Sequence, residues 1–255
     1  MLQTKPTEHL TGITIRGDYN DFSELVDSIY RIVGLDDNPK DMYYGVKNRL
    51  LGICYEIRHA YQGDRGITLV ENSMNEDIMK WHKLITAKTN VYFSVEVLFP
   101  EAIFVAASVP QIYIFSEQYY GSRAKTNEME ISSVPYAELL KDKANLDVLC
   151  AGIWRALGEV VGNEELEKII HSYHLADESY MHYATEYIDK CNIELIKTSN
   201  EKRKDKLRNI AKRIVKKPKA YYSLENELNY WAKEYNTNIY ELHNPNLEYP
   251  EEIDW

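Results

Sequence analysis

The residues best suited to chemistry lie together in the segment 56–65, which reads EIRHAYQGDR. Its polar side chains can transfer protons, bind anions or donate hydrogen bonds. They are Glu56, Arg58, His59, Gln62, Asp64 and Arg65. Groups of this kind gather at active and binding sites. We therefore take this cluster as the candidate catalytic site.

The same segment is expected to end a helix that runs from about residue 43 to 61, with Gly63 as its stop. With Ile57 at the centre of the buried stripe and about 100° of rotation per residue, the cluster divides. Arg58, Gln62 and Arg65 fall on one flank of the helix, and Glu56 and His59 fall on the other. The alternative is structural: ion pairs of Glu56 and Arg58 anchor the helix, and Asp64 and Arg65 tie the following turn.

This segment resembles the core motif of HEPN ribonucleases. A helix leads into Arg58 and a polar neighbour, and a Gly63-Asp64 pair follows. In that family the arginine and a histidine four to six residues later act on the RNA phosphate, whereas positions 62–64 here hold no histidine. Glutamine cannot act as a general acid or base. The resemblance thus implies a metal-independent ribonuclease in which Arg58 holds phosphate, His59 moves the proton and Glu56 orients it.

A basic helix is expected over 201–219, where ten lysines and arginines stand against two acids in a chain of net charge −10. Leu207, Ile210 and Ile214 give it an apolar side, so it should dock on the protein. It could present cations to nucleic acid, or it could pair with the acidic body of its own chain or of a partner. We favour pairing, because no aromatic residue lies in the run to stack on bases. The candidate binding residues are Lys204, Arg208, Lys212, Arg213, Lys216 and Lys217.

A group of histidines suggests a metal site as a third possibility. On one helix, His174, Glu178 and His182 would be spaced i, i+4 and i+8 along one face, with ligands that suit zinc or iron. Eight residues span about 12 Å of helix, however, which is too far for both histidines to bind one ion. We therefore expect hydrogen-bonded histidines, no metal and no cofactor.

The elements that must position these residues are strands near the N-terminus and helices beyond. Strands are expected over 11–16, 66–70 and 90–99. Asn20 or Asp21 should cap a first helix, with Glu24 closing the cap. Pro100 should begin a long apolar helix that Pro110 kinks or breaks. Further helices are expected near 136–142, 146–161, 163–173, 176–198, 200–217 and 223–235.

These elements predict an α+β fold that is predominantly helical. A small antiparallel sheet in the N-terminal half should pack on helices, and the C-terminal half should form a helical bundle. The polar loop 121–133 is the expected boundary between an α+β part, 1–120, and a helical part, 134–255. The two parts would form one compact unit or two closely packed lobes.

Composition narrows the class of protein. The chain of 255 residues has three separated cysteines and no CxxC pair, as expected for reduced core thiols in the cytoplasm. The apolar stretch 95–115 carries Glu96 and Glu101, so we expect core elements and no membrane span. Twenty-one tyrosines suit seams between helices or a partner surface. The acidic tail ends in Trp255, which we expect to dock back on the protein.

Over nearly its whole length the chain also resembles an uncharacterised bacterial protein family of unknown function. The landmarks are LTGITIRGDYNDF (10–22), YEIRHAYQGDRGI (55–67), NVYFSVEVLFPEAIF (90–104) and YWAKEYNTNIYELHNP (230–245). This resemblance implies a bacterial, cytosolic protein. It implies no activity, and it assigns no functional residues.

Three functional hypotheses follow. The first is an interaction or regulatory protein without catalysis, whose partner is another protein or a second copy of itself. A link to mobile elements or phage defence is suggested by the HEPN resemblance alone. The alternatives are a HEPN-like ribonuclease, with RNA guided by the basic helix 201–219, and a helical metal-binding protein.

Overall fold

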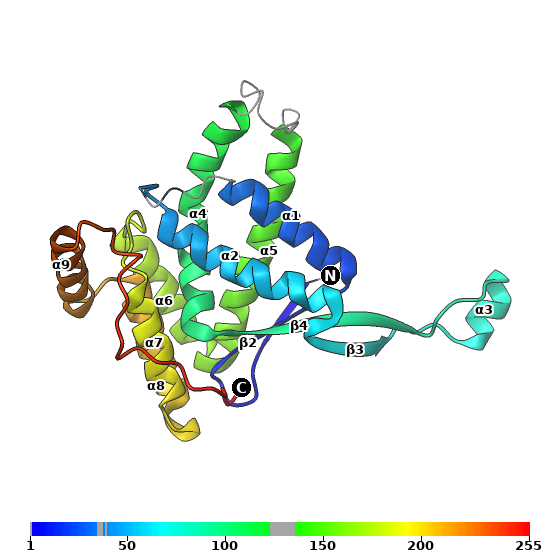
Figure 1. Cartoon of the computed structure of the whole chain (residues 1–255). Coiled ribbons are helices and arrows are strands. Elements are labelled where there is room, and N and C mark those ends of the chain that lie inside the picture. The colour runs from blue at the N-terminus through cyan, green and yellow to red at the C-terminus, as the bar shows by residue number, and fades with distance from the viewer. Residues whose placement is uncertain (1, 35–37, 39, 123–135) are drawn as a thin grey trace.

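The computed structural model describes residues 2–34, 38, 40–122 and 136–255 (Figure 1). Its strands form a four-stranded antiparallel sheet in the order β1-β2-β4-β3. They are β1 (Gln3–Pro6), β2 (Gly12–Gly17), β3 (Gly66–Glu71) and β4 (Thr89–Leu98). The three expected strands are confirmed. Strand β1 was not expected, because a short edge strand that ends in proline carries no alternating apolar pattern.

One face of the sheet forms part of the core. Ile13 and Ile15 of β2 stand opposite Val97 and Val95 of β4, and all four side chains are buried. The alternation of strand side chains directs these residues to the helices. The sheet is therefore covered by helices over β2 and the second half of β4.

The N-terminal half contains the helices α1 (Tyr19–Val33), α2 (Tyr44–His59), α3 (Glu76–His82) and α4 (Phe99–Ser122). The cap of α1 differs from the expectation. The Asp18 carboxylate accepts from the Asp21 backbone N–H at 2.9 Å, and the Asp21 carboxylate accepts from the Asp18 N–H at 3.1 Å. The capping box thus begins two residues earlier than Asn20, because Asp18 supplies the same acceptor.

Helix α4 is the central core helix. It continues through Pro110 as a single helix, so of the expected kink or break the break does not occur. Its stretch Phe99–Glu117 is long and apolar enough to cross a membrane, but 72% of it is buried inside the protein. This burial accounts for its apolar composition, as expected for a core element.

The C-terminal half is helical, and its elements are α5 (Tyr136–Val161), α6 (Asn163–Ala176), α7 (Glu186–Ile196), α8 (Asn200–Val215) and α9 (Lys219–Glu234). One helix, α5, replaces the two expected over 136–161. The expected helix over 176–198 is wrong at its start, because α7 begins ten residues later. Most of the expected boundary loop lies outside the described residues.

The two halves share one continuous hydrophobic core. Helix α5 packs against α1, α4 and β1, and Tyr180, Tyr183 and Tyr221 are buried at helix seams. After α9 the chain runs back across the molecule to the β1–β2 turn, where the His9 N–H donates to the Trp255 carbonyl at 3.1 Å. The expected docking of the C-terminal tryptophan is therefore confirmed. The four-stranded sheet and the helices together confirm the α+β class.

Candidate functional site

The cluster 56–65 occupies the break after α2. The helix passes at His59 into a π-helical turn, Ala60–Asp64, that ends because Gly63 adopts φ +97°. This left-handed conformation costs a residue with a side chain about 1–2 kcal/mol, whereas glycine adopts it freely. The chain reverses there and enters β3.

The reversal brings together side chains that a straight helix would separate. Arg65 Nε lies 2.8 Å from the Glu56 carboxylate, and His59 Nδ1 lies 3.0 Å from the Asp64 carboxylate. The expectation that Arg65 and Glu56 lie on opposite flanks is therefore wrong, because the helix ends before Arg65. Hydrogen bonding and the nearby charge of Glu56 raise the pKa of Arg65.

The Arg58 side chain contacts two tyrosines. Its Nη1 lies 3.3 Å from the Tyr30 hydroxyl, and its guanidinium lies 5.5 Å from the centre of the Tyr55 ring. Gln62 is exposed. The proposed role of Glu56 in orienting His59 needs correction, because Asp64 occupies that position and Glu56 binds Arg65. None of the cluster residues 56–65 lines either of the two hollows near the C-terminal segment.

The basic helix α8 is bound to acids of its own chain. Lys206 lies 2.9 Å from Glu194, which also pairs with Arg213, and Lys212 pairs with Glu165. Arg208 lies 3.2 Å from Asp205 on the same helix. Lys217 donates to the Ser179 carbonyl and lies over tyrosine rings. Of the six candidate binding residues, Lys204 and Lys216 are exposed and have no ion pair within the described part of the chain.

The candidate metal ligands do not share a helix. Helix α6 ends at Ala176, and Asp177 and His182 both adopt a positive φ. His174 is therefore on α6, whereas Glu178 and His182 lie in the connection to α7. The helical spacing fails because the chain breaks inside it. Within the described residues, no three metal-binding side chains are placed to share an ion.

Arg49 lies at a polar hollow of about 380 Å³ between α2, α7 and the C-terminal segment. Its guanidinium donates to Glu101 at 2.9 Å, to Asp189, and to the Thr185 carbonyl at 3.1 Å. Burial raises the pKa of Glu101, partly offset by Arg49. Because Tyr249 also donates to Asp189 at 2.7 Å, this network fastens the C-terminal segment to the protein.

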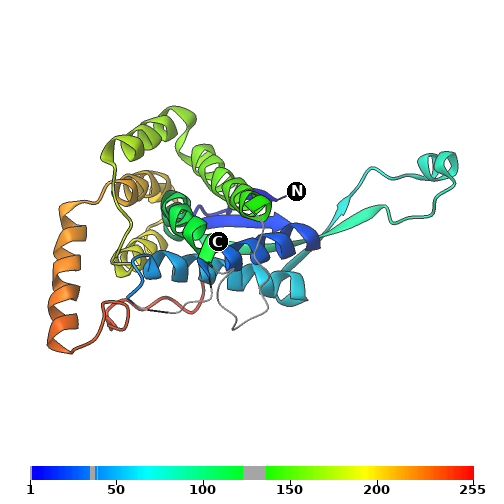
Figure 2. The ribbon, with the colours of Figure 1, turned by 90° about the horizontal axis from the view of Figure 1, so that it is seen from above.

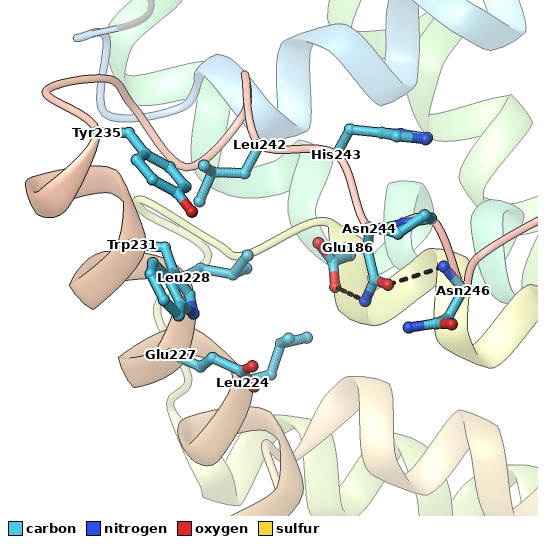
Figure 3. A pocket seen from close by; sticks show the side chains of 11 residues that line it. Glu186, Leu224, Glu227, Leu228, Trp231, Tyr235, Leu242, His243, Asn244 and Asn246 are labelled. Atoms are coloured by element: carbon cyan, nitrogen blue, oxygen red, sulfur yellow. Dashed lines mark hydrogen bonds between the residues drawn. The ribbon is translucent and has the colours of Figure 1, made fainter.

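A second hollow, of about 300 Å³, lies between α9 and the segment that follows it (Figure 3). Leu224, Leu228 and Trp231 face Leu242 across it, and Glu186 receives a hydrogen bond from Asn244 at 3.0 Å. Polar side chains such as Glu227, His243 and Asn246 also line it, so the hollow is mixed in character. None of these residues was expected from the sequence to form a site.

The most unusual surface was also missed from the sequence. Residues 66–93 form an arm: β3 and the first half of β4 leave the body as a hairpin with α3 at its tip (Figures 1 and 2). Every residue of β3 is exposed, and no residue of α3 is buried. Strand β3 is also an edge strand, so one side of its backbone has no strand neighbour among the described residues.

The arm is apolar as well as exposed. At the tip, 84% of Trp81 and 97% of Ile85 are accessible to solvent, and on the hairpin 65% of Leu69 is accessible. The other exposed large apolar residues of the arm are Ile67, Val70, Ile78, Leu84 and Val91. Exposed apolar residues that gather in this way mark interaction sites.

Polar contacts of the backbone shape the tip. The Asn72 side chain donates to the Ala87 carbonyl at 3.1 Å, and the Asn75 side chain caps α3 by accepting from the N–H of Ile78 at 3.0 Å. Lys88 lies 3.5 Å from Glu76. The tip is thus shaped by local hydrogen bonds, which leaves its apolar side chains free for another molecule. The alternation of Ile67 and Leu69 and the run WHKLI (81–85) are the sequence signals for this surface.

The comparisons with known proteins identify a family and no activity. Residues 2–255 match the family model described as Domain of unknown function (DUF6904). No curated protein and no solved structure matches the chain.

Proposed function

We propose that this chain, which belongs to the DUF6904 family of unknown function, is a protein-binding protein without catalysis. It works in the bacterial cytoplasm, where its buried thiols stay reduced. One observation carries this proposal: an apolar arm leaves the body and is covered by nothing in the described structure. Covering an apolar surface with another protein removes it from water and so lowers the free energy of the complex.

The polar cluster at the base of the arm supports binding more than catalysis. Glu56, Arg65, His59 and Asp64 partner one another where β3 begins. Interfaces commonly surround an apolar centre with polar side chains of this kind. The cluster thus forms part of the rim of the binding surface.

Cross-linking in bacterial cells tests this function. The cells would express the tagged chain, the arm variant Ile85→Glu or the control Leu175→Glu. Leu175 is 72% exposed and lies on α6, away from the arm. We expect the wild type and the control to form the same cross-linked protein complexes and the arm variant to lose them. The same set of complexes from all three chains would contradict the proposal.

A ribonuclease is the second candidate, and one arrangement favours it. Asp64 holds the His59 imidazole at 3.0 Å, and the neighbouring Arg58 has no carboxylate bound to it in the described structure. A carboxylate-held histidine beside an unpaired arginine could move a proton and bind a phosphate. A role in phage defence would follow from this activity.

Incubation of the purified chain with total RNA separates the two functions. The binding function predicts background cleavage by both the wild type and Arg58→Ala. Cleavage by the wild type that Arg58→Ala and His59→Ala both abolish would establish the ribonuclease instead.

A further inference from the structure

We propose that the partner of the arm is a second copy of this chain. Two arms pack against each other around a two-fold axis, with their apolar faces inward. This inference rests on the proposed protein-binding function and names its partner.

The sheet register supports packing through one face of the arm. Residues directly opposite each other on neighbouring strands point to the same side of the sheet. Ile67 stands opposite Phe93, and Leu69 stands opposite Val91. These residues continue the face on which Val95 and Val97 are buried, since strand side chains alternate. The core face of the sheet thus extends beyond the body, where no helix of the described structure covers it.

The size of the apolar surface matches a stable interface. The eight exposed apolar side chains of the arm present on the order of 1,000 Å², although Val70, opposite Asn90, lies on the other face of the hairpin. A standard interface buries about 800 Å² per partner. The arm alone is therefore large enough to hold two copies together. Trp81 supplies the kind of aromatic anchor that dominates binding energies.

The charges of the arm match those of another arm. Three acids precede three lysines along it, so its acids and bases balance while the whole chain carries −10. The acids are Glu71, Glu76 and Asp77, and the lysines are Lys80, Lys83 and Lys88. In a two-fold interface, residue i of one copy meets residue j of the other and the reverse, so the surface must complement itself. An arm without net charge meets this condition, because two copies of it come together without net repulsion.

The same balance argues against other partners. RNA and anionic membranes attract surfaces with an excess of lysine and arginine. The arm has none. A strongly acidic or basic protein would likewise find no opposite net charge there.

Sedimentation equilibrium on the full chain, at concentrations on the order of 1–100 µM, tests this proposal. We expect the wild type and Leu175→Glu to form dimers of twice 29.8 kDa. Leu69→Glu and Ile85→Glu should each raise the dimer dissociation constant at least tenfold. Ile85 lies beyond α3 and is almost fully exposed, so its change cannot remove a core contact. Circular dichroism should show the same helix content for all four chains.

A second measurement reports on the arm itself. Acrylamide quenching of tryptophan fluorescence, compared between the wild type and Trp81→Phe, isolates the signal of Trp81. We expect Trp81 to become protected as the concentration rises through the dissociation constant. Raised salt should strengthen the dimer, because it screens the repulsion between two chains of charge −10 each.

The outcomes separate this inference from the proposed function. A wild type that stays monomeric at 100 µM overturns the dimer, and arm-dependent complexes with other proteins in cells would then leave the binding function intact. A dimer that both arm variants retain also overturns the inference, because its interface then lies elsewhere. A monomer that forms no arm-dependent complex in cells overturns both.

Discussion

Arg65 Nε lies 2.8 Å from the Glu56 carboxylate, although nine residues separate them and a straight helix would place them on different flanks. The chain reverses at Gly63, whose φ is +97°. One glycine thus decides which residues of the cluster meet. The arm begins three residues later, at Gly66.

Replacing Gly63 with alanine should destabilise the protein by about 1–2 kcal/mol, because a side chain is strained at positive φ. Urea denaturation measures this change. Gly52→Ala is the matched control, because Gly52 lies within α2 and an added Cβ would meet nothing within 4 Å. That substitution should stabilise the protein by about 0.5–1 kcal/mol. Equal effects of the two substitutions would show that Gly63 does not need its left-handed conformation.

Arg203 fastens both ends of the chain. Its buried guanidinium donates to the His9 carbonyl at 2.8 Å, to the Asp254 carboxylate at 3.1 Å and to the Thr198 carbonyl at 3.0 Å. Arg203→Ala leaves these acceptors without their donor, so we expect a loss of about 3 kcal/mol in urea denaturation. The neighbouring Lys204→Ala should change stability by less than about 0.5 kcal/mol, because Lys204 is exposed. A loss of stability below about 0.5 kcal/mol for Arg203→Ala would show that Arg203 does not hold the two ends of the chain in place.

Glu194 should make stability depend on pH. Burial alone would raise its pKa, but hydrogen bonds from Arg213 and Lys206 hold the pKa below its ordinary value of 4.5. A carboxyl whose pKa is lowered on folding stabilises the protein above its unfolded pKa, and this stability is lost as pH falls through the folded pKa. Glu194→Gln should therefore cost about 1 kcal/mol at pH 7 and little in acid.

Thermal denaturation between pH 3 and pH 8 measures this difference. Glu164→Gln is the control, because its partner Lys168 is a solvent-exposed neighbour on the same helix. The pKa of Glu164 is lowered as well, but by an exposed ion pair that solvent screens, so we expect that variant to depart from the wild type much less than Glu194→Gln does. A constant loss for Glu194→Gln at every pH would mean that packing, and not charge, explains its effect.

The cysteines should be unreactive in the folded protein. Burial raises the pKa of Cys54 to about 11 and those of Cys150 and Cys191 to about 12. At pH 8 the thiolate fraction of such groups is on the order of 10⁻³ or less, and the thiolate is the reactive form. A thiol reagent at pH 8 should therefore label almost no cysteine in the native chain and all three in guanidinium. Rapid native labelling of any of them would show that its surroundings open.

The local pattern of the sequence predicted most of the elements. Alternating apolar residues located β2, β3 and β4, and helical spacing located the helices of both halves. The opposite charges within the chain predicted that the basic residues of α8 would pair with acids elsewhere in the chain. Lys206 and Lys212 do so, with Glu194 and Glu165. These features depend on neighbours along the chain or on overall charge, and a sequence displays both directly.

Tertiary structure alone decided which side chains meet and which face solvent. The spacing of His174, Glu178 and His182 reads as helical, yet the connection after α6 follows packing around Tyr180 and Tyr183. Ile67 and Leu69 have the same alternation as Ile13 and Ile15, but one pair is exposed and the other is buried. Periodicity shows that a strand has an apolar face. Whether a helix of the same chain covers that face depends on where the rest of the chain goes, because contacts between distant segments decide burial.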